Sequence, residues 1–160
     1  MQESQLSRLL SAEKGRLRGH YFMGTWDSSV FGNDDAADFS FEFDDADTVA
    51  EVAPIIENAL DAVLNSTLDL EAPDGATGLA AAALVVAWNE PGLLGNDAAY
   101  APAPWPRTTE PLPRNLHTKA AAVLDRVKNA EGNELAQLWA ESGEIAEFNA
   151  EIARWRSRLA

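Results

Sequence analysis

The sequence of 160 residues contains no cysteine and only two histidines, His20 and His117. Without cysteine the chain has no disulfide bond, no thiolate nucleophile and no cysteine-ligated zinc site. Two histidines are too few for a histidine-rich metal centre, and a Ser-His-Asp triad would have to use one of them. His117 is the better placed of the two, but no acidic neighbour that would make it a general base is visible, so we interpret it as an exposed helix residue.

Long apolar runs are also missing. The longest, "LAAAALVVAW" at residues 79–88, falls well short of the roughly 20 residues that a membrane-spanning helix needs. The N-terminus lacks the charged region and apolar block of a secretory signal. We therefore expect a cytoplasmic protein. The sequence also lacks a phosphate-binding glycine loop, an H-E-x-x-H motif and a nucleophile elbow, so no cofactor is predicted.

Basic residues are absent from residues 19–106, which carry sixteen Asp and Glu residues. Residues 107–160 hold eight acidic and eight basic residues, and the whole chain has a formal net charge of −14. The acidic part would repel nucleic-acid phosphates and anionic lipid, so we expect neither a nucleic-acid nor a membrane partner. Two interpretations stay open: ordinary surface acidity that favours solubility, or attraction to a basic protein or to cations.

Residues 1–22 differ in charge from the part that follows. The first 18 residues contain four Lys or Arg and two acidic residues. We predict that Met23 is the natural start, that residues 1–22 are an N-terminal extension, and that residues 23–160 form the folded domain.

Apolar residues recur at helical spacing through most of the chain. The predicted helices cover about residues 34–45, 48–64, 76–89, 115–129, 133–142 and 144–159. Asn33 or Asp34 is expected to cap the first helix, and Thr48 with Glu51 forms a capping box at the second, in which Pro54 introduces a kink or marks the true first turn. Residues 65–78, "NSTLDLEAPDGATG", are predicted to be a connector. The helix at 76–89 is apolar nearly all round, which is typical of the centre of a bundle. The fold class is therefore all-α, a single-domain bundle of about six helices.

Six of the eight prolines lie within residues 89–114. This density excludes a helix or a central strand, so we predict a long extended loop. Its segment "APAPWPRTTEPLP" is compatible with a polyproline ligand. The favoured alternative is that it wraps around the bundle and buries Trp105.

The stretch "MGTWDSSVFGNDDAADF", residues 23–39, resembles the opening of a bacterial family, domain of unknown function number 4259. That family tends to begin Met-Gly-x-Trp, followed by a Phe and then by Asn-Asp-x-Ala-x-Asp and an aromatic residue. The matching positions here are Met23, Gly24, Trp26, Phe31, Asn33, Asp34, Ala36, Asp38 and Phe39. The alanine-rich segment at 79–88 and "NELAQLWAESG" at 133–143 are similar to later parts of the family. The resemblance covers about residues 23–160 and implies a bacterial all-α domain without an accepted activity.

The same opening stretch supplies the candidate site. Asp34 and Asp38 are four residues apart on a predicted helix and share a face, so with Asp27 and Asn33 they could bind Ca²⁺ or Mg²⁺ through oxygen atoms. The calcium-loop pattern fails, however, because the sixth and twelfth positions counted from Asp45 are Ala50 and Ile56. The favoured interpretation is a capped helix entry that also serves as a recognition surface. The candidate residues for that surface are Trp26, Asp27, Phe31, Asn33, Asp34, Asp38 and Trp105.

Two functions follow as expectations. The first is a non-enzymatic protein–protein interaction module with a basic partner, comparable in size and charge to small immunity proteins or regulators. The second is a carboxylate-based, metal-dependent enzyme that uses Asp27, Asp34 and Asp38. The sequence does not determine the oligomeric state.

Overall fold

The computed structural model describes residues 30–66, 69–129 and 131–159. Within them the chain forms six α-helices and two 3-10 helices, with no β-strand, which confirms the predicted all-α bundle. The helices are α1 (Asp34–Ser40), α2 (Val49–Leu64), α3 (Ala72–Asn89), α4 (Arg114–Lys128), α5 (Glu134–Glu141) and α6 (Ile145–Arg156), and the 3-10 helices are η2 (Phe41–Phe43) and η3 (Pro91–Ala99). The predicted extension at 1–22 lies outside the described residues.

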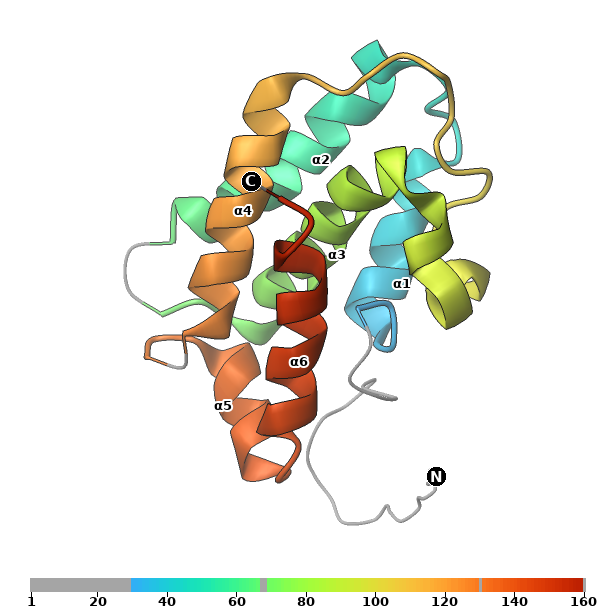
Figure 1. Cartoon of the computed structure of the whole chain (residues 1–160). Coiled ribbons are helices and arrows are strands. Elements are labelled where there is room, and N and C mark those ends of the chain that lie inside the picture. The colour runs from blue at the N-terminus through green and yellow to red at the C-terminus, as the bar shows by residue number, and fades with distance from the viewer. Residues whose placement is uncertain (1–29, 67–68, 130, 160) are drawn as a thin grey trace.

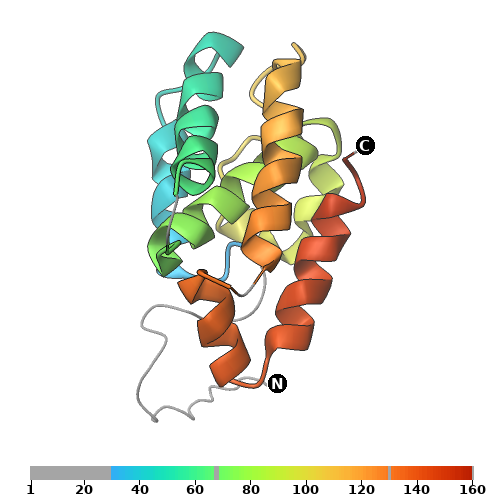
Figure 2. The same cartoon turned by 90° about the vertical axis from the view of Figure 1, so that its left-hand side faces the viewer.

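Helix α3 runs through the middle of the bundle (Figure 1). It contacts α1, α2, α4, α5, α6 and η3, and every residue from Gly78 to Trp88 is buried. The view turned by 90° shows α2 and α4 side by side, with α3 crossing behind them (Figure 2). The sequence-based expectation that the apolar helix lies at the centre is thus confirmed. Among the described residues, no helix is long and apolar enough to span a membrane.

The first two helices have the predicted N-terminal caps, and α5 has a cap that was not predicted. The Asn33 Oδ1 atom accepts a hydrogen bond of 2.8 Å from the backbone N–H of Ala36. Thr48 and Glu51 form the expected capping box of α2. Asn133 caps α5, where its side chain is buried and also donates to the carbonyls of Val127 and Asn129. Each cap satisfies backbone N–H groups that a helix leaves without a partner in its first turn.

Two boundaries differ from the predictions, and one of the two alternatives for Pro54 is excluded. Helix α3 begins at Ala72, so the end of the predicted connector is helical, because Pro73 lies in the first turn, where its missing N–H costs nothing. Helix α2 begins at Val49, so Pro54 does not mark its first turn. Residues 91–99 form η3 and not an extended loop, since this stretch has only one proline, at its first position.

The first turn of α3 is tied to α5. Leu70 forms an isolated parallel bridge to Asn133, in which the Leu70 N–H donates to Gly132 and the Leu70 carbonyl accepts from the Glu134 N–H. The Glu134 carboxylate then accepts from the N–H of Ala72, the first residue of α3. These bonds fix the start of the central helix against the C-terminal half of the chain.

Helices α2 and α3 approach closely at Gly78. A Cβ atom at this position would lie 2.3 Å from Cγ2 of Val63 and 3.4 Å from the Ala59 carbonyl oxygen. A methyl group therefore cannot be added unless the two helices separate or Val63 moves. Gly75, one turn earlier in α3, is different, since its Cβ would only reach van der Waals contact with Leu135.

We expect Gly78→Ala to lower the free energy of unfolding by about 1–3 kcal/mol, the usual cost of overpacking a core. Gly75→Ala is the matched control, because it brings the same gain in helix propensity, roughly 0.5–1 kcal/mol, without the clash. Chemical denaturation of both variants measures the difference. The double variant Gly78→Ala/Val63→Ala should be more stable than the sum of the two single effects predicts. Equal stability of the two glycine variants would contradict this close packing.

Candidate functional site

The residues predicted to form one surface separate into three groups. Trp26 and Asp27 lie outside the described residues. Phe31 is 0% exposed and Trp105 is 8% exposed, so both are core residues and not parts of an exposed surface. Asn33 is half-buried and acts as the helix cap, whereas Asp34 and Asp38 are exposed on α1.

Trp105 is buried because the segment that carries it wraps around α3, as the favoured interpretation of the proline-rich stretch predicted. Its indole N–H donates to the Leu84 carbonyl of α3 at 3.0 Å, and the indole N–H of Trp88 donates to the backbone carbonyl of Glu110 at 2.7 Å. The ring of Trp105 also makes edge-to-face contacts with Phe43 and Trp88, at centroid distances of 5.3 and 5.0 Å. Such pairs contribute stability beyond the burial of their area.

Two large hydrophobic side chains are exposed in the described part of the chain, and sequence reasoning missed both. Phe41 is 67% exposed and Tyr100 is 51% exposed. Phe39 and Phe43 already occupy the core side of α1 and η2, where their ring centroids are 5.2 Å apart. Phe41, between them in the sequence, therefore faces outward. The alternation of three phenylalanines in "FSFEF" was the available signal, because one helix stripe cannot bury all three.

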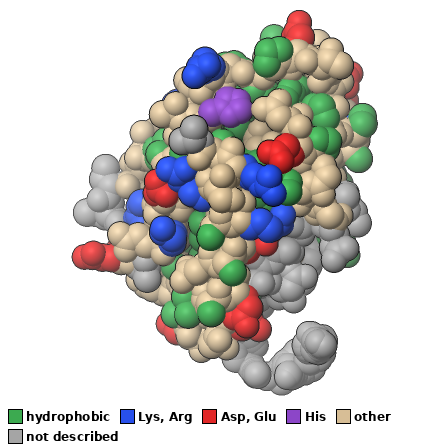
Figure 3. Space-filling model, in the orientation of Figure 1, with side chains coloured by type: hydrophobic (Ala, Val, Ile, Leu, Met, Phe, Trp, Pro, Cys, Tyr) green, Lys and Arg blue, Asp and Glu red, His purple; other side chains and the backbone are tan. Residues whose placement is uncertain are grey.

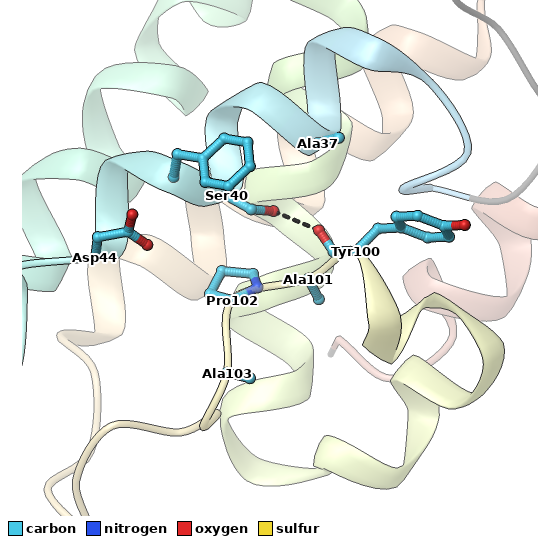
Figure 4. A pocket seen from close by; sticks show the side chains of 8 residues that line it. Ala37, Ser40, Asp44, Tyr100, Ala101, Pro102 and Ala103 are labelled. Carbon is cyan, nitrogen blue, oxygen red and sulfur yellow. Dashed lines mark hydrogen bonds between the residues drawn. The ribbon is translucent and has the colours of Figure 1, made fainter.

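Phe41 and Tyr100 border the same hollow. Its volume is about 170 Å³ and it is lined by Ala37, Ser40, Phe41, Asp44, Tyr100, Ala101, Pro102 and Ala103. Figure 4 shows the two sides of this hollow, α1 and η2 on one side and residues 100–103 on the other, with Asp44 and Tyr100 towards opposite ends. The Ser40 hydroxyl donates to the Tyr100 carbonyl at 2.8 Å and holds the two sides together.

Arg107 holds the Ala103 end of residues 100–103 against η2. Its guanidinium donates to the Phe43 carbonyl at 2.7 Å and to the Ala103 carbonyl at 2.8 Å. The Arg107 guanidinium therefore binds backbone carbonyls and forms no salt bridge with a described carboxylate. Among the residues that the structure describes, no Lys or Arg lines the hollow.

The carboxylates beside the hollow form no salt bridge with a described Lys or Arg. We use the name α1–η2 acidic surface for six exposed residues, none of which forms a salt bridge with a described Lys or Arg: Asp34, Asp35, Asp38, Glu42, Asp44 and Asp45. Several acidic residues elsewhere do have such partners, since Glu57 and Asp61 pair with Lys119 and Asp125 pairs with Arg156.

The effect of this crowding is clearest at Asp35. Burial, followed by the negative charges of Asp34, Asp38 and Asp74, raises the pKa of the Asp35 carboxyl group above its ordinary value. Asp74 lies in the first turn of α3, so acidic residues of two helices face each other here. Among the described residues, however, no group of three or more His, Asp or Glu side chains is close enough together to hold a metal ion. Asp34 and Asp38 therefore do not complete a metal site with other described residues.

The cap gives a first prediction for this region. We expect Asn33→Ala to lower the free energy of unfolding by about 0.5–2 kcal/mol, because the N–H of Ala36 loses its acceptor. Asn33→Ser keeps an acceptor and should be nearly neutral. Asp34→Ala should cost less than Asn33→Ala, since the Asp34 side chain caps nothing. Denaturant titrations of the three variants test this order, and an equal loss for Asn33→Ala and Asn33→Ser would show that the cap is not the reason.

The raised pKa of Asp35 gives a second prediction. The folded state binds the Asp35 proton more tightly than the unfolded state, so the charge destabilises the fold at neutral pH and this cost disappears as the pH falls below the ordinary value of about 3.9. Asp35→Asn should therefore raise the melting temperature at pH 7 and leave it unchanged near pH 3. The effect is modest because the side chain is exposed.

The control for Asp35 is Asp34→Asn, which removes a charge from the same first turn and loses the same favourable interaction with the helix dipole. Glu51→Gln should have the opposite sign, because hydrogen bonds from the backbone of Asp47 and Thr48 lower the pKa of Glu51. The stabilising effect of the native Glu51 carboxylate is present above the ordinary pKa of a Glu and is lost as the pH falls through the lowered pKa of Glu51. Thermal melts between pH 3 and 7 would reject the interpretation if Asp35→Asn destabilised the fold as Asp34→Asn does.

Comparison with known proteins supports the sequence resemblance. The family described as Domain of unknown function (DUF4259) matches residues 24–151. No curated protein and no solved structure shows significant similarity to the chain. The match includes the opening stretch, the central helix α3 and most of α6. Since this match covers well over half of the chain, the chain belongs to the DUF4259 family.

Proposed function

We propose that this domain is a protein–protein interaction module that binds a basic partner through α1, η2 and residues 100–103. The observation that carries the proposal is the position of Phe41 and Tyr100. They are the exposed large hydrophobic residues of the described chain, and they border one hollow beside carboxylates that pair with no described Lys or Arg. Exposed apolar groups gathered at one place and rimmed by charge are typical of interaction sites.

The distribution of charge supports a basic partner. On the face shown in Figure 3, Lys and Arg side chains gather over α4 and the C-terminal half of α6, with acidic residues among them. Arg154, Arg156 and Arg158 there pair with Glu151, Asp125 and Glu90. Helix α1 contacts α3 and η2 but neither α4 nor α6, so these cations do not neutralise the α1–η2 acidic surface. A partner that brings Lys or Arg to this surface would relieve repulsion within it.

An interaction role is favoured over the metal-dependent enzyme by the form of the site. The hollow is about 170 Å³, whereas pockets that enclose small-molecule ligands usually have 300–1,000 Å³. The carboxylates lie on the outer side of a helix and do not converge on the hollow, apart from Asp44. An immunity protein or a regulator that sequesters a basic protein is the finer class that this arrangement suits best.

The proposal is tested with two variants of equal net charge. In the first, four residues of the α1–η2 acidic surface are neutralised: Asp34→Asn, Asp38→Asn, Glu42→Gln and Asp45→Asn. In the second, four exposed carboxylates elsewhere are neutralised: Glu110→Gln, Glu131→Gln, Glu141→Gln and Glu147→Gln. Affinity purification from the source cells, followed by titration of each retained protein, compares both variants with the unmodified chain.

We expect a basic protein that binds the unmodified chain and the second variant, and whose affinity for the first variant falls by at least about tenfold. This loss should appear in the association rate and should diminish as salt is added, because screening removes long-range attraction. If both variants bound the partner equally well, the binding site would lie outside the α1–η2 acidic surface. If both lost the partner equally, binding would depend on the net charge of the chain and not on this surface.

A further inference from the structure

We infer that the hollow between α1–η2 and residues 100–103 takes a single apolar side chain from a partner segment that carries Lys or Arg on both sides of that residue. The inference rests on the proposed function and adds to it the kind of segment that binds. It depends on the size of the hollow, on the position of the carboxylates along it and on the rigidity of its two sides.

The size of the hollow limits the occupant to one side chain. A volume of about 170 Å³ is close to that of an engineered cavity of about 150 Å³ in another protein that holds one benzene molecule. The lining is mostly apolar and includes Ala37, Ala101, Pro102 and Ala103 in addition to the two aromatic residues. A phenyl ring or a long aliphatic side chain fits this space, whereas a whole peptide helix does not.

The position of the carboxylates sets the spacing of the basic residues. Asp44 lines the hollow itself and directly follows η2, whereas Asp34 and Asp38 lie on α1, on either side of Ala37 in the sequence. Asp34 and Asp44 are ten positions apart, and a rise of about 1.5 Å per residue in α1 and about 2.0 Å in η2 gives roughly 15–17 Å. An extended chain covers that distance in about four or five residues. A segment with a basic residue two positions before and two positions after its apolar anchor therefore matches the site.

The two sides of the hollow are held in place from within the protein. Ser40 binds the Tyr100 carbonyl on one side, and Arg107 joins the Phe43 and Ala103 carbonyls on the other. Phe39, Phe43 and Trp105 anchor both sides in the core beneath. A preformed site loses little conformational freedom when a ligand binds, so even one anchor residue can be recognised.

The test uses two synthetic peptides with blocked ends, Lys-Lys-Phe-Lys-Lys and Lys-Lys-Ala-Lys-Lys. They carry the same charge and differ only in the anchor. Their affinities are measured at low ionic strength by NMR titration, with the methyl groups of Ala37, Ala101 and Ala103 as reporters of the hollow. We expect the Phe peptide to bind about tenfold more tightly than the Ala peptide and to shift these methyl signals, because only its ring buries apolar surface there.

Two variants locate the effect. Ala103→Trp fills the hollow from an exposed position, and Phe41→Ala removes one wall without disturbing the core. Both should abolish the preference for Phe while leaving the affinity for the Ala peptide nearly unchanged. Asp44→Asn should weaken both peptides, whereas Glu131→Gln, on the loop before α5, should weaken neither.

The outcomes separate this inference from the proposed function. Equal binding of both peptides, with losses only for Asp44→Asn, would overturn the apolar anchor and leave the basic partner standing. Absence of methyl shifts up to millimolar peptide would overturn the anchor as well, whatever the charge variants show with a full-length partner. If Phe41→Ala instead abolished a concentration-dependent self-association of the chain, the hollow would be an interface between two copies and the inference would be wrong.

Discussion

The structure depends on the burial of α3, which is continuous from Gly78 to Trp88. Because α3 contacts all the other described α-helices and η3, small and branched apolar residues line its sides. The alanines at 80–83 and the glycine at position 78 let backbones approach closely, so that packing is sensitive to a single methyl group. A buried polar group on α3 needs a hydrogen-bond partner among the elements that surround the helix. The contacts of α3 are chiefly apolar, and its Leu84 carbonyl accepts a hydrogen bond from the indole N–H of Trp105.

The wrapping of the proline-rich segment around α3 creates the proposed binding face. Prolines keep residues 101–113 extended, and the two indole N–H groups fasten the segment at both ends to α3. The aromatic series from Phe39 through Phe43 and Trp105 to Trp88 then links α1 to the centre of the bundle. With these rings inside, Phe41 and Tyr100 remain outside, so the face results from how the core is filled and not from a separate binding loop.

Charge is separated in the molecule in the same way as in the sequence. Most basic residues follow position 106, and four of these pair with described carboxylates away from α1 and η2: Lys119 with Glu57 and Asp61, Arg154 with Glu151, Arg156 with Asp125 and Arg158 with Glu90. The carboxylates of α1 and η2 pair with no described Lys or Arg, and their mutual repulsion adds to burial in raising the pKa of Asp35. Apart from the helix-dipole interaction in the first turn of α1, these charges are available for recognition, at a small cost in stability.

The sequence by itself determined the helices, the caps of α1 and α2, the central position of α3 and the acidic character of residues 19–106, because each depends on local spacing or composition. It also carried the family resemblance in residues 23–39. Only the tertiary structure decided which aromatic residues are exposed. Phe31 and Trp105 were candidates for the recognition surface and are buried, as the favoured interpretation of the proline-rich segment predicted for Trp105, while Phe41 and Tyr100 were not singled out and border the hollow. The reason is physical: exposure depends on which neighbours reach a side chain, and residues 40 and 100 meet only when the chain wraps around α3.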